Sequence, residues 1–227
     1  MYLIGLTGSI GSGKSTVAKM LIERNIPVVD ADFYARKVVE PGKPAWKKIK
    51  ANFGEDVFKE NGELDRTRLG QIIFEDKAKR RLLNEITHPE IYKEIFKVCV
   101  LHFFQGRPYV VLDLPLLFEH GALVGYMHKI IVVTCERDQQ IQRLRSRDNM
   151  DEASAVLRVQ SQWSMEEKAK RANFVIDNAG TVDETKEQVE KMMAIIEDDN
   201  FHIRIRVCIA VAAGLICGFF YFVFLSS

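Results

Sequence analysis

One stretch near the N-terminus decides the fold, and it reads Gly8-Ser9-Ile10-Gly11-Ser12-Gly13-Lys14-Ser15. It fits the pattern G-x-x-x-x-G-K-[ST] and lies between an apolar run at 3–7 and a helical pattern that begins near Lys14. Glycines allow the backbone N–H groups of such a loop to close around phosphate oxygens. The N-terminus of the following helix adds a partial positive charge. The stretch therefore predicts a phosphate-binding loop (P-loop) on a strand–loop–helix unit.

We expect this loop to hold the phosphates of a nucleotide together with Mg²⁺. Lys14 would neutralise the β- and γ-phosphates, Ser15 would ligate the metal ion, and Thr16 is placed to reach the α-phosphate. The residues expected to bind the nucleotide are Gly8, Ser9, Ile10, Gly11, Ser12, Gly13, Lys14, Ser15 and Thr16. The sequence has no base-reading N-K-x-D motif, which argues against a GTPase. The D-x-x-G match that begins at Asp177 comes too late in the chain, so we interpret it as a turn after a strand.

Apolar runs alternate with helical patterns along the first 200 residues. We expect strands at 3–7, 28–30, 109–113, 129–134 and 174–176. We expect helices at about 14–24, 33–40, most of 44–105, 138–146, 151–160, 164–170 and 182–197. Strands separated by long helical stretches are typical of a parallel sheet covered on both faces. The predicted fold class is α/β, a three-layer sandwich with a mostly parallel five-stranded sheet.

Composition excludes several classes of protein. The 227 residues carry a formal net charge of +1, so we expect no nucleic-acid partner. Hydrophobic residues make up 47% and charged residues 28%, which is typical of a folded domain and not of a disordered chain. The four cysteines form no C-x-x-C pair, which argues against a disulfide scaffold or a zinc module.

An acidic pair follows the second predicted strand. Asp30 and Asp32 lie on one side of an extended segment because side chains alternate with a period of two. An acid at this place in a small-molecule kinase can accept the proton of the acceptor hydroxyl, and we expect Asp32 to do so. The alternative is that these acids cap the helix expected from Phe33, with Asp32 as the N-cap.

Arginines are frequent in the predicted helix at 138–146 and just after it. Arg143 and Arg147 are four residues apart, so they share one face of a helix. Two guanidinium groups on one face can close over a transferring phosphoryl group and neutralise it. We expect a catalytic lid here, the alternative being a basic helix that only faces solvent.

Taken together, these motifs resemble the dephospho-coenzyme A kinase family. The match runs from Leu3 to about Glu197 and is carried by separate motifs in the same order. They are Gly5-Leu6-Thr7-Gly8-Ser9-Ile10-Gly11-Ser12-Gly13-Lys14-Ser15, Asp30-Ala31-Asp32, Ala35-Arg36, Val39, Pro41-Gly42, Gly62, Leu64-Asp65-Arg66, Leu69-Gly70, Ile73-Phe74, Leu83-Asn84, Thr87-His88-Pro89, Asp113-Leu114-Pro115-Leu116-Leu117-Phe118-Glu119 and the spacing of Arg158 and Gln162.

The resemblance implies ATP-dependent phosphorylation of the ribose 3′-hydroxyl of dephospho-CoA. It implies a kinase domain at 1–200, with an acceptor-binding region at about 33–105 and a lid at about 138–172. Asp32 is then the base, and Arg36 and His88 face the acceptor. Asp113 would hold Mg²⁺ through water. His88 has an alternative, since a residue before a proline can end one helix and start the next.

One residue departs from the family pattern. The family usually has Gly where this chain has Ser9, and a serine with positive φ would cost about 1 kcal/mol.

Two rival functions remain open at this point: a kinase of another small-molecule acceptor, and a membrane-tethered nucleotide-binding module without turnover.

The C-terminal segment differs in composition from the rest of the chain. Val207–Leu225 contains 19 residues without a charge, and a helix of that length is about 28 Å long, close to the hydrocarbon thickness of a bilayer. We expect a transmembrane helix at 203–225, the alternative being a buried core helix. Arg204 and Arg206 lie at the N-terminal end of this helix, just before the charge-free stretch, which favours a single-pass C-terminal anchor with the kinase domain facing the cytosol.

The anchor sequence does not distinguish between two target membranes, the mitochondrial outer membrane and the endoplasmic reticulum. Ala210, Gly214 and Gly218 recur every four residues and so lie along one stripe of the helix. Small residues at this spacing allow two helices to approach closely in lipid, which permits a weak homodimer.

Overall fold

The computed structural model describes residues 1–198, and these residues fall into two compact units. One unit combines Met1–Val28 with the described residues from His102 onward, and the other is Val29–Leu101.

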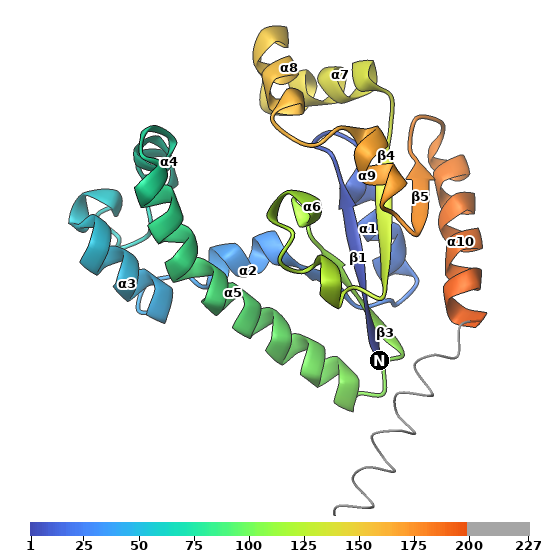
Figure 1. Cartoon of the computed structure of the whole chain (residues 1–227), viewed down its shortest axis with the longest axis horizontal. Coiled ribbons are helices and arrows are strands. Elements are labelled where there is room, and N and C mark those ends of the chain that lie inside the picture. The colour runs from blue at the N-terminus through green and yellow to red at the C-terminus, as the bar shows by residue number, and fades with distance from the viewer. Residues whose placement is uncertain (199–227) are drawn as a thin grey trace, which may run out of the picture. The chain divides into compact units, whose positions relative to one another are not determined.

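The chain forms a five-stranded sheet, and the first unit holds all of it except Val29 and Asp30 (Figure 1). The strands are β1 (Tyr2–Gly8), β2 (Val28–Asp30), β3 (Tyr109–Asp113), β4 (Lys129–Thr134) and β5 (Phe174–Asp177). Their order is β2-β3-β1-β4-β5, which makes β1 the central strand. β1 pairs in parallel with β3 and β4, and β4 pairs in parallel with β5. This confirms the predicted α/β fold with a five-stranded parallel sheet.

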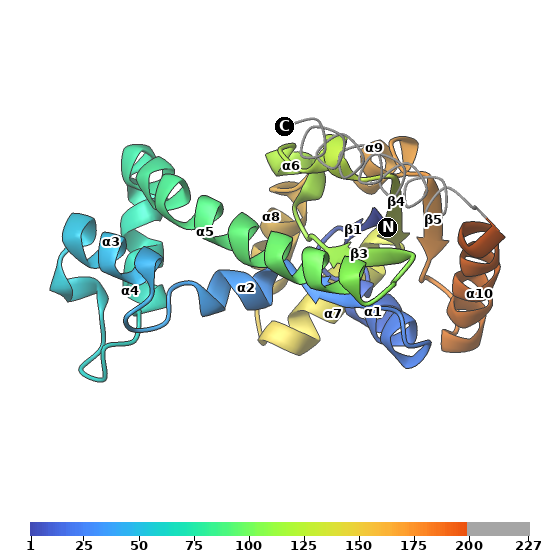
Figure 2. The same cartoon turned by 90° about the horizontal axis from the view of Figure 1, so that it is seen from below.

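Side-chain alternation along β1 divides the unit into layers. Tyr2, Ile4 and Leu6 point to the face where α1 (Lys14–Glu23) and α10 (Val182–Asp198) bury their apolar sides. On the other face, a side chain at Gly5 would meet Leu117 at 2.9 Å, so the chain there needs glycine for close packing. Figure 2 shows α6 (Leu117–His120) and α9 (Met165–Lys170) on the side of the sheet away from α1.

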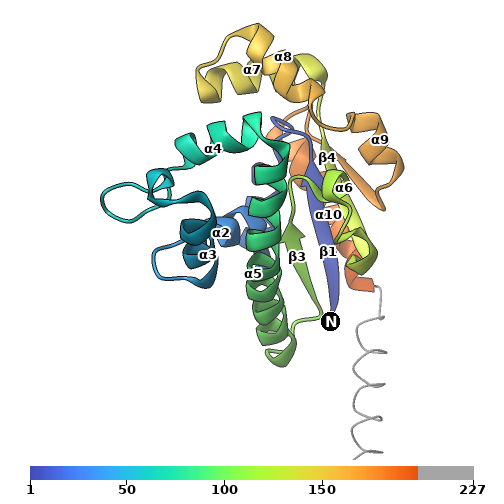
Figure 3. The same cartoon turned by 60° about the vertical axis from the view of Figure 1, so that its left-hand side comes forward.

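Two further helices of this unit, α7 (Arg137–Asp148) and α8 (Glu152–Gln160), lie side by side (Figure 3). The turn between them is built by short polar side chains. Asn149 adopts a left-handed conformation at the end of α7, and Asp151 caps α8 by accepting a hydrogen bond from the Ser154 N–H. A 3₁₀ turn at Val124–Tyr126 precedes β4. The helix pair α7–α8 occupies the first part of the predicted lid.

The second unit is helical, with α2 (Ala31–Lys37), α3 (Pro44–Phe53), a 3₁₀ turn at Glu55–Val57, α4 (Arg66–Glu75) and most of α5 (Lys77–Phe104). Its core brings together apolar residues of α3, α4 and α5 with residues of the 3₁₀ turn and of the segment after α2, chiefly Val38, Val39, Ala45, Ile49, Val57, Leu69 and Ile86. Two local expectations need correction here. α2 begins at Ala31 and not at Phe33, because the carboxylate of Asp30 accepts hydrogen bonds from the N–H groups of Asp32 and Phe33. Asp30, not Asp32, is therefore the N-cap. α5 also runs unbroken through Pro89, so His88 lies inside one helix and not between two.

The predicted membrane span at 203–225 lies outside the described residues, as do Arg204, Arg206, Ala210, Gly214 and Gly218. Within residues 1–198 no helix combines the length and the apolar character that crossing a bilayer requires.

Candidate functional site

The P-loop leaves the end of β1 and enters α1 through two glycines in the left-handed region. Gly11 has φ of 77° and Gly13 has φ of 88°, values that favour glycine. Ser9 does not share this conformation, because among residues 1–198 the non-glycine residues with positive φ are Asn25 and Asn149. Ser9 is buried and its hydroxyl donates a hydrogen bond to the carbonyl oxygen of Trp163 at 3.4 Å. The expected cost of serine at this position therefore does not arise.

Neighbouring elements press closely on the loop glycines. A Cβ atom at Gly8 would lie 2.7 Å from the backbone oxygen of Val133, and one at Gly11 would lie 3.0 Å from that of Gln140. At Gly13 a Cβ atom would lie 1.9 Å from Nδ2 of Asn178. These three glycines are required by close packing against β4, α7 and the turn after β5.

Four side chains bind the backbone of the loop from outside. The N–H of Ile10 donates to Oε1 of Gln162 at 2.9 Å, and Nε2 of Gln140 donates to the carbonyl oxygen of Ile10 at 2.7 Å. Nδ2 of Asn178 donates to the carbonyl oxygen of Ser12 at 2.8 Å. The fourth is the guanidinium of Arg143. Side chains from outside the loop thus fix its backbone shape.

The two predicted lid arginines have different partners. Arg143 donates to the carbonyl oxygens of Ser12 at 3.2 Å and Asn178 at 3.0 Å, so it lies against the loop. Arg147 instead binds the carboxylate of Asp148 with both Nε and Nη2, at 2.7 and 2.9 Å. That carboxylate also accepts a hydrogen bond from Arg158 of α8 at 3.2 Å, and its pKa is lowered mainly by the hydrogen bond from Arg147. The structure brings Arg143 to the loop and places Arg147 in the α7–α8 ion-pair cluster.

Lys14 and Asp113 form an ion pair beside the loop. Lys14 is the first residue of α1, and Asp113 is the last residue of β3, next to Leu6 of β1 in the sheet. Both side chains are largely buried, with 17% and 11% of their surface exposed. Asp113 therefore supplies a counter-charge to Lys14 at the end of β3.

The loop fits a nucleotide triphosphate. The hydroxyl of Ser12 is buried and has no hydrogen-bond partner within residues 1–198, and the N-cap of α1 is Gly13, which has no side chain to cap the helix. An uncapped helix N-terminus and an unused hydroxyl beside Lys14 are donors for phosphate oxygens.

The metal candidates are few. Ser15 is exposed in the first turn of α1, and Asp113 is held by Lys14. The described part of the chain contains no cluster of three or more His, Cys, Asp or Glu side chains. Mg²⁺ in kinases is bound mainly by substrate phosphates and waters with one or two protein ligands, so this sparse donor set fits a metal ion that arrives with the nucleotide.

The predicted acceptor residues all belong to the second unit. Asp32 is exposed in the first turn of α2, and Arg36 is exposed in its last turn. His88 is half-buried in α5, with its ring centroid 5.7 Å from that of Tyr92. The roles of these three side chains remain predictions.

The residues that sequence reasoning missed are the outer supports of the loop. Asn178 follows β5 directly, and in the sequence a D-N-x-G stretch there indicates a simple turn. Gln140 lies on a helix without any motif, and Gln162 entered only as part of a spacing with Arg158. No single-sequence signal assigns Gln140 to the loop, whereas Asn178 lies one residue past a parallel strand, at the edge where sites gather.

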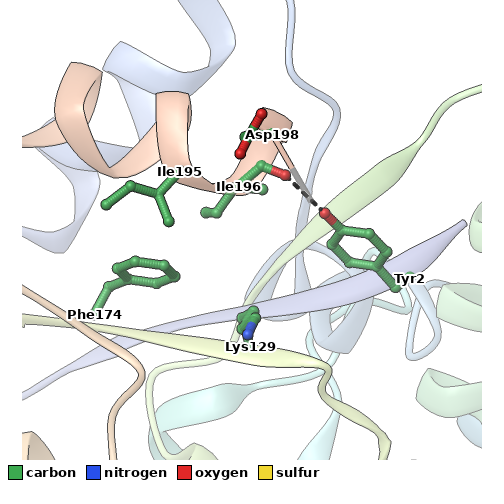
Figure 4. A pocket seen from close by; sticks show the side chains of 6 residues that line it. All are labelled: Tyr2, Lys129, Phe174, Ile195, Ile196 and Asp198. Carbon is green, nitrogen blue, oxygen red and sulfur yellow. Dashed lines mark hydrogen bonds between the residues drawn. The ribbon is translucent and has the colours of Figure 1, made fainter. Parts of the chain in front are cut away.

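A cavity of about 200 Å³ lies at the opposite ends of the strands. It is lined by Tyr2, Lys129, Phe174, Ile195, Ile196 and Asp198, and the hydroxyl of Tyr2 donates to the carbonyl oxygen of Ile196 (Figure 4). Tyr2, Lys129 and Phe174 each stand at the start of a strand, whereas the P-loop follows the end of β1. This cavity is separate from the nucleotide site.

The sheet order, the loop and its lysine define the class: this is an α/β protein with a P-loop kinase fold. Residues 2–184 match the family model described as dephospho-CoA kinase. The chain belongs to the dephospho-CoA kinase family.

Relatives cover nearly the whole chain. A dephospho-CoA kinase domain-containing protein of Danio rerio is 46% identical over 216 residues, which is 95% of this chain and 94% of the relative. A dephospho-CoA kinase of Bacillus cereus is 47% identical over 191 residues, covering 84% of this chain and 95% of the bacterial one.

Solved structures agree with this assignment. Dephospho-CoA kinase from Campylobacter jejuni superposes with a TM-score of 0.67 at 28% identity, over 87% of this chain and 98% of that one. TT1252 from Thermus thermophilus superposes with a TM-score of 0.76 at 32% identity, over 88% and 98% of the two chains.

Proposed function

We propose that this protein transfers the γ-phosphoryl group of ATP to the ribose 3′-hydroxyl of dephospho-CoA and so produces coenzyme A. The observation that carries the proposal is that a complete P-loop, with Lys14 at the start of α1, lies within residues 2–184, which match the dephospho-CoA kinase family model.

The chain's own groups divide the work of binding and proton transfer. The Ser12 hydroxyl and the uncapped N-terminus of α1 bind phosphate oxygens. Lys14 exchanges its ion pair with Asp113 for the β- and γ-phosphates, which neutralises charge at the transferring group. Asp32 accepts the proton of the acceptor hydroxyl. Arg143 holds the loop, and Arg147 adds positive charge if it leaves Asp148 when the lid closes.

Bound Mg²⁺ would supply positive charge that stabilises the transferring phosphoryl group. Ser15 and Asp113 are the side chains that would hold it, Ser15 directly and Asp113 through water. Asp113→Ala should raise the Mg²⁺ concentration for half-maximal activity several-fold. Measuring activity against Mg²⁺ concentration checks this, and an unchanged requirement would remove Asp113 from the metal site.

The test of the reaction is turnover of the purified full-length chain with ATP, Mg²⁺ and a panel of hydroxyl acceptors. We expect dephospho-CoA to give the highest kcat/KM by a wide margin. Lys14→Ala should lower kcat/KM by roughly 10²–10³, the effect of losing one group that stabilises developing charge. A higher kcat/KM with another alcohol would transfer the assignment to a different small-molecule kinase. ATP binding without any turnover would support a nucleotide-binding module instead.

Asp32 has its own test. Asp32→Asn keeps the shape of the side chain but removes the base, so kcat should fall roughly 10²–10⁴-fold while KM for ATP stays near its original value. Wild-type turnover in this variant would remove Asp32 as the base.

We also propose that residues 203–225 anchor the chain in a membrane, with the kinase domain in the cytosol. The support is the charge-free stretch Val207–Leu225 behind Arg204 and Arg206. The full chain should remain in the membrane fraction after carbonate extraction, and a chain that ends at Asp198 should not. Retention of the shortened chain on membranes would contradict the anchor.

The identity of the membrane and the pairing of anchors can be measured together. Fractionation separates the mitochondrial outer membrane from the endoplasmic reticulum, the two locations that we propose. Pairing through Ala210, Gly214 and Gly218 predicts that Gly214→Leu weakens crosslinking of the full chain in membranes. Crosslinking that is unaffected by this change would exclude pairing along this stripe.

A further inference from the structure

Lys168 is a fully buried lysine near the end of α9. None of its side-chain surface is exposed, a rare state for a lysine unless the charge is paired. Its Nζ lies 2.7 Å from Oε1 of Glu119 in α6, and only 16% of the Glu119 side chain is exposed. The two residues form a buried ion pair on the face of the sheet away from α1.

This ion pair is poorly satisfied. Oε2 of Glu119 is buried and has no hydrogen-bond partner in the described part of the chain, and Nζ of Lys168 meets Glu119 as a charge contact without hydrogen-bond geometry. A buried pair with unused polar atoms contributes little to the stability of a fold, and apolar replacements of such pairs are often neutral. Core packing alone therefore gives no reason for these two charges.

Glu119 also holds the segment 162–164, which joins α8 to α9. Its Oε1 accepts a hydrogen bond from the N–H of Trp163 at 3.2 Å. The Trp163 ring stacks on Phe118 with an interplanar angle of 8°, and the guanidinium of Arg171 lies 4.5 Å from the ring centroid. The backbone N–H and the ring of Trp163 are thus both held, by Phe118 and Glu119 of α6 and by Arg171 just after α9.

The same segment contacts the P-loop at two consecutive residues. The carbonyl oxygen of Trp163 accepts from the Ser9 hydroxyl at 3.4 Å, and Oε1 of Gln162 accepts from the N–H of Ile10 at 2.9 Å. A short path of hydrogen bonds therefore leads from Glu119 through the segment 162–164 to the loop.

We propose that Glu119 and Lys168 are a positioning pair, which holds the segment 162–164 against the P-loop and so sets the affinity for ATP. The proposal deepens the kinase function above and rests on it for turnover, but nucleotide binding tests it separately. Lys168 fixes the Glu119 carboxylate in one orientation, and Glu119 fixes Trp163. Neither residue touches the nucleotide.

The test compares three variants of the full chain: Glu119→Gln, Lys168→Met, and both together. Lys168→Met leaves a buried unpaired carboxylate, so we expect a large drop in thermal stability. The double variant carries no buried charge, so its stability should return close to the wild-type value. Its KM for ATP should nevertheless stay about three- to tenfold high, the effect of one weakened hydrogen bond, while kcat with saturating ATP changes less. Recovery of KM together with stability would show that the pair is only structural.

A spectroscopic readout keeps binding apart from turnover. The chain contains two tryptophans, so in a Trp46→Phe background the fluorescence reports on Trp163 alone. Both the Trp163 emission and its change on adding ATP should differ between the wild-type pair and the double variant. Identical spectra and ATP titrations would overturn the proposal even if the wild-type chain phosphorylates nothing. A chain that binds ATP but lacks turnover would instead refute the proposed function.

Lys191 provides a matched control for the substitution of Lys168. Lys191 forms an exposed ion pair with Glu187 on α10, and Lys191→Met should change neither stability nor KM for ATP.

If the double variant fails to fold, Glu119→Gln and Gln162→Leu are compared singly and combined. Because both act through the segment 162–164, their effects on KM for ATP should not add. Additive effects would contradict the proposed path.

Discussion

The side-chain amide of Asn178 connects the P-loop to α10. Nδ2 donates to the carbonyl oxygen of Ser12 at 2.8 Å, and Oδ1 accepts from the hydroxyl of Thr185 at 3.0 Å. Asn178→Ala should raise KM for ATP about three- to tenfold and lower the free energy of unfolding by about 1–3 kcal/mol, because buried partners lose their hydrogen bonds. ATP titration and urea unfolding measure the two effects.

Asn173 provides the matched control for that change. Its Oδ1 accepts a hydrogen bond from the N–H of Ile130 at 2.8 Å, at the start of β4 and away from the loop. Asn173→Ala should therefore lower stability without changing KM for ATP. Equal KM values in the two variants would mean that Asn178 does no more than support the fold.

For single residues, the sequence predicts the members of the contiguous P-loop motif better than the side chains that hydrogen-bond the loop from other elements. Lys14 and the glycines follow from the motif spacing because the loop needs them in adjacent positions. Gln140, Gln162 and Asn178 reach the loop from separate elements, and only the folded chain brings them together. Asp30 and Asp32 were distinguishable only by the start of α2, since either acid has the residue type of an N-cap.

Among the elements, the turn from the P-loop into α1 depends on Gly13 for two reasons. Its φ of 88° favours glycine, and a Cβ atom there would lie 1.9 Å from Asn178. Gly42 has a similar φ of 83° but open space around it. Gly42→Ala should therefore cost only about 1–2 kcal/mol of backbone strain, whereas Gly13→Ala adds a clash and should abolish ATP binding. Thermal unfolding and ATP titration of both variants check this, and equal effects would contradict the packing argument.

Element prediction succeeds where a repeating pattern decides the outcome. The strands follow from apolar runs, and the alternation of Tyr2, Ile4 and Leu6 toward α1 and α10 is the period of two that a sheet imposes. It fails at α5, where Pro89 suggests two helices and the structure has one. Ile86 on that helix is buried in the core of the second unit, so tertiary packing outweighs the local preference of proline to end a helix.

Across the whole first unit, Tyr109 links the sheet to the end of α10. Its hydroxyl donates to Oε1 of Glu197 at 3.3 Å. Burial of the ring, with the nearby Glu197 carboxylate, raises the pKa of Tyr109 to about 12. Because the folded-state pKa lies above the usual 10.0, this group's contribution to stability is complete below about pH 10 and is lost as pH rises toward 12.

Tyr109→Phe removes that titration. The free energy of unfolding of the wild-type chain should therefore fall more steeply between pH 10 and pH 12 than that of the variant. Urea unfolding at several pH values in this range measures both slopes. Parallel slopes would show that the pKa of Tyr109 is the same in the folded and unfolded chains.

The central claim concerns the reaction of the whole molecule, and the position of the transferred phosphate tests it most directly. The full chain is incubated with dephospho-CoA, Mg²⁺ and ATP labelled in the γ-phosphoryl group, and the product is analysed by mass spectrometry and phosphorus NMR. We expect one labelled phosphate on the ribose 3′-hydroxyl, giving coenzyme A, and only background label with Lys14→Ala. Dephospho-CoA that remains unlabelled while the chain binds ATP, or label on any other hydroxyl, would contradict it.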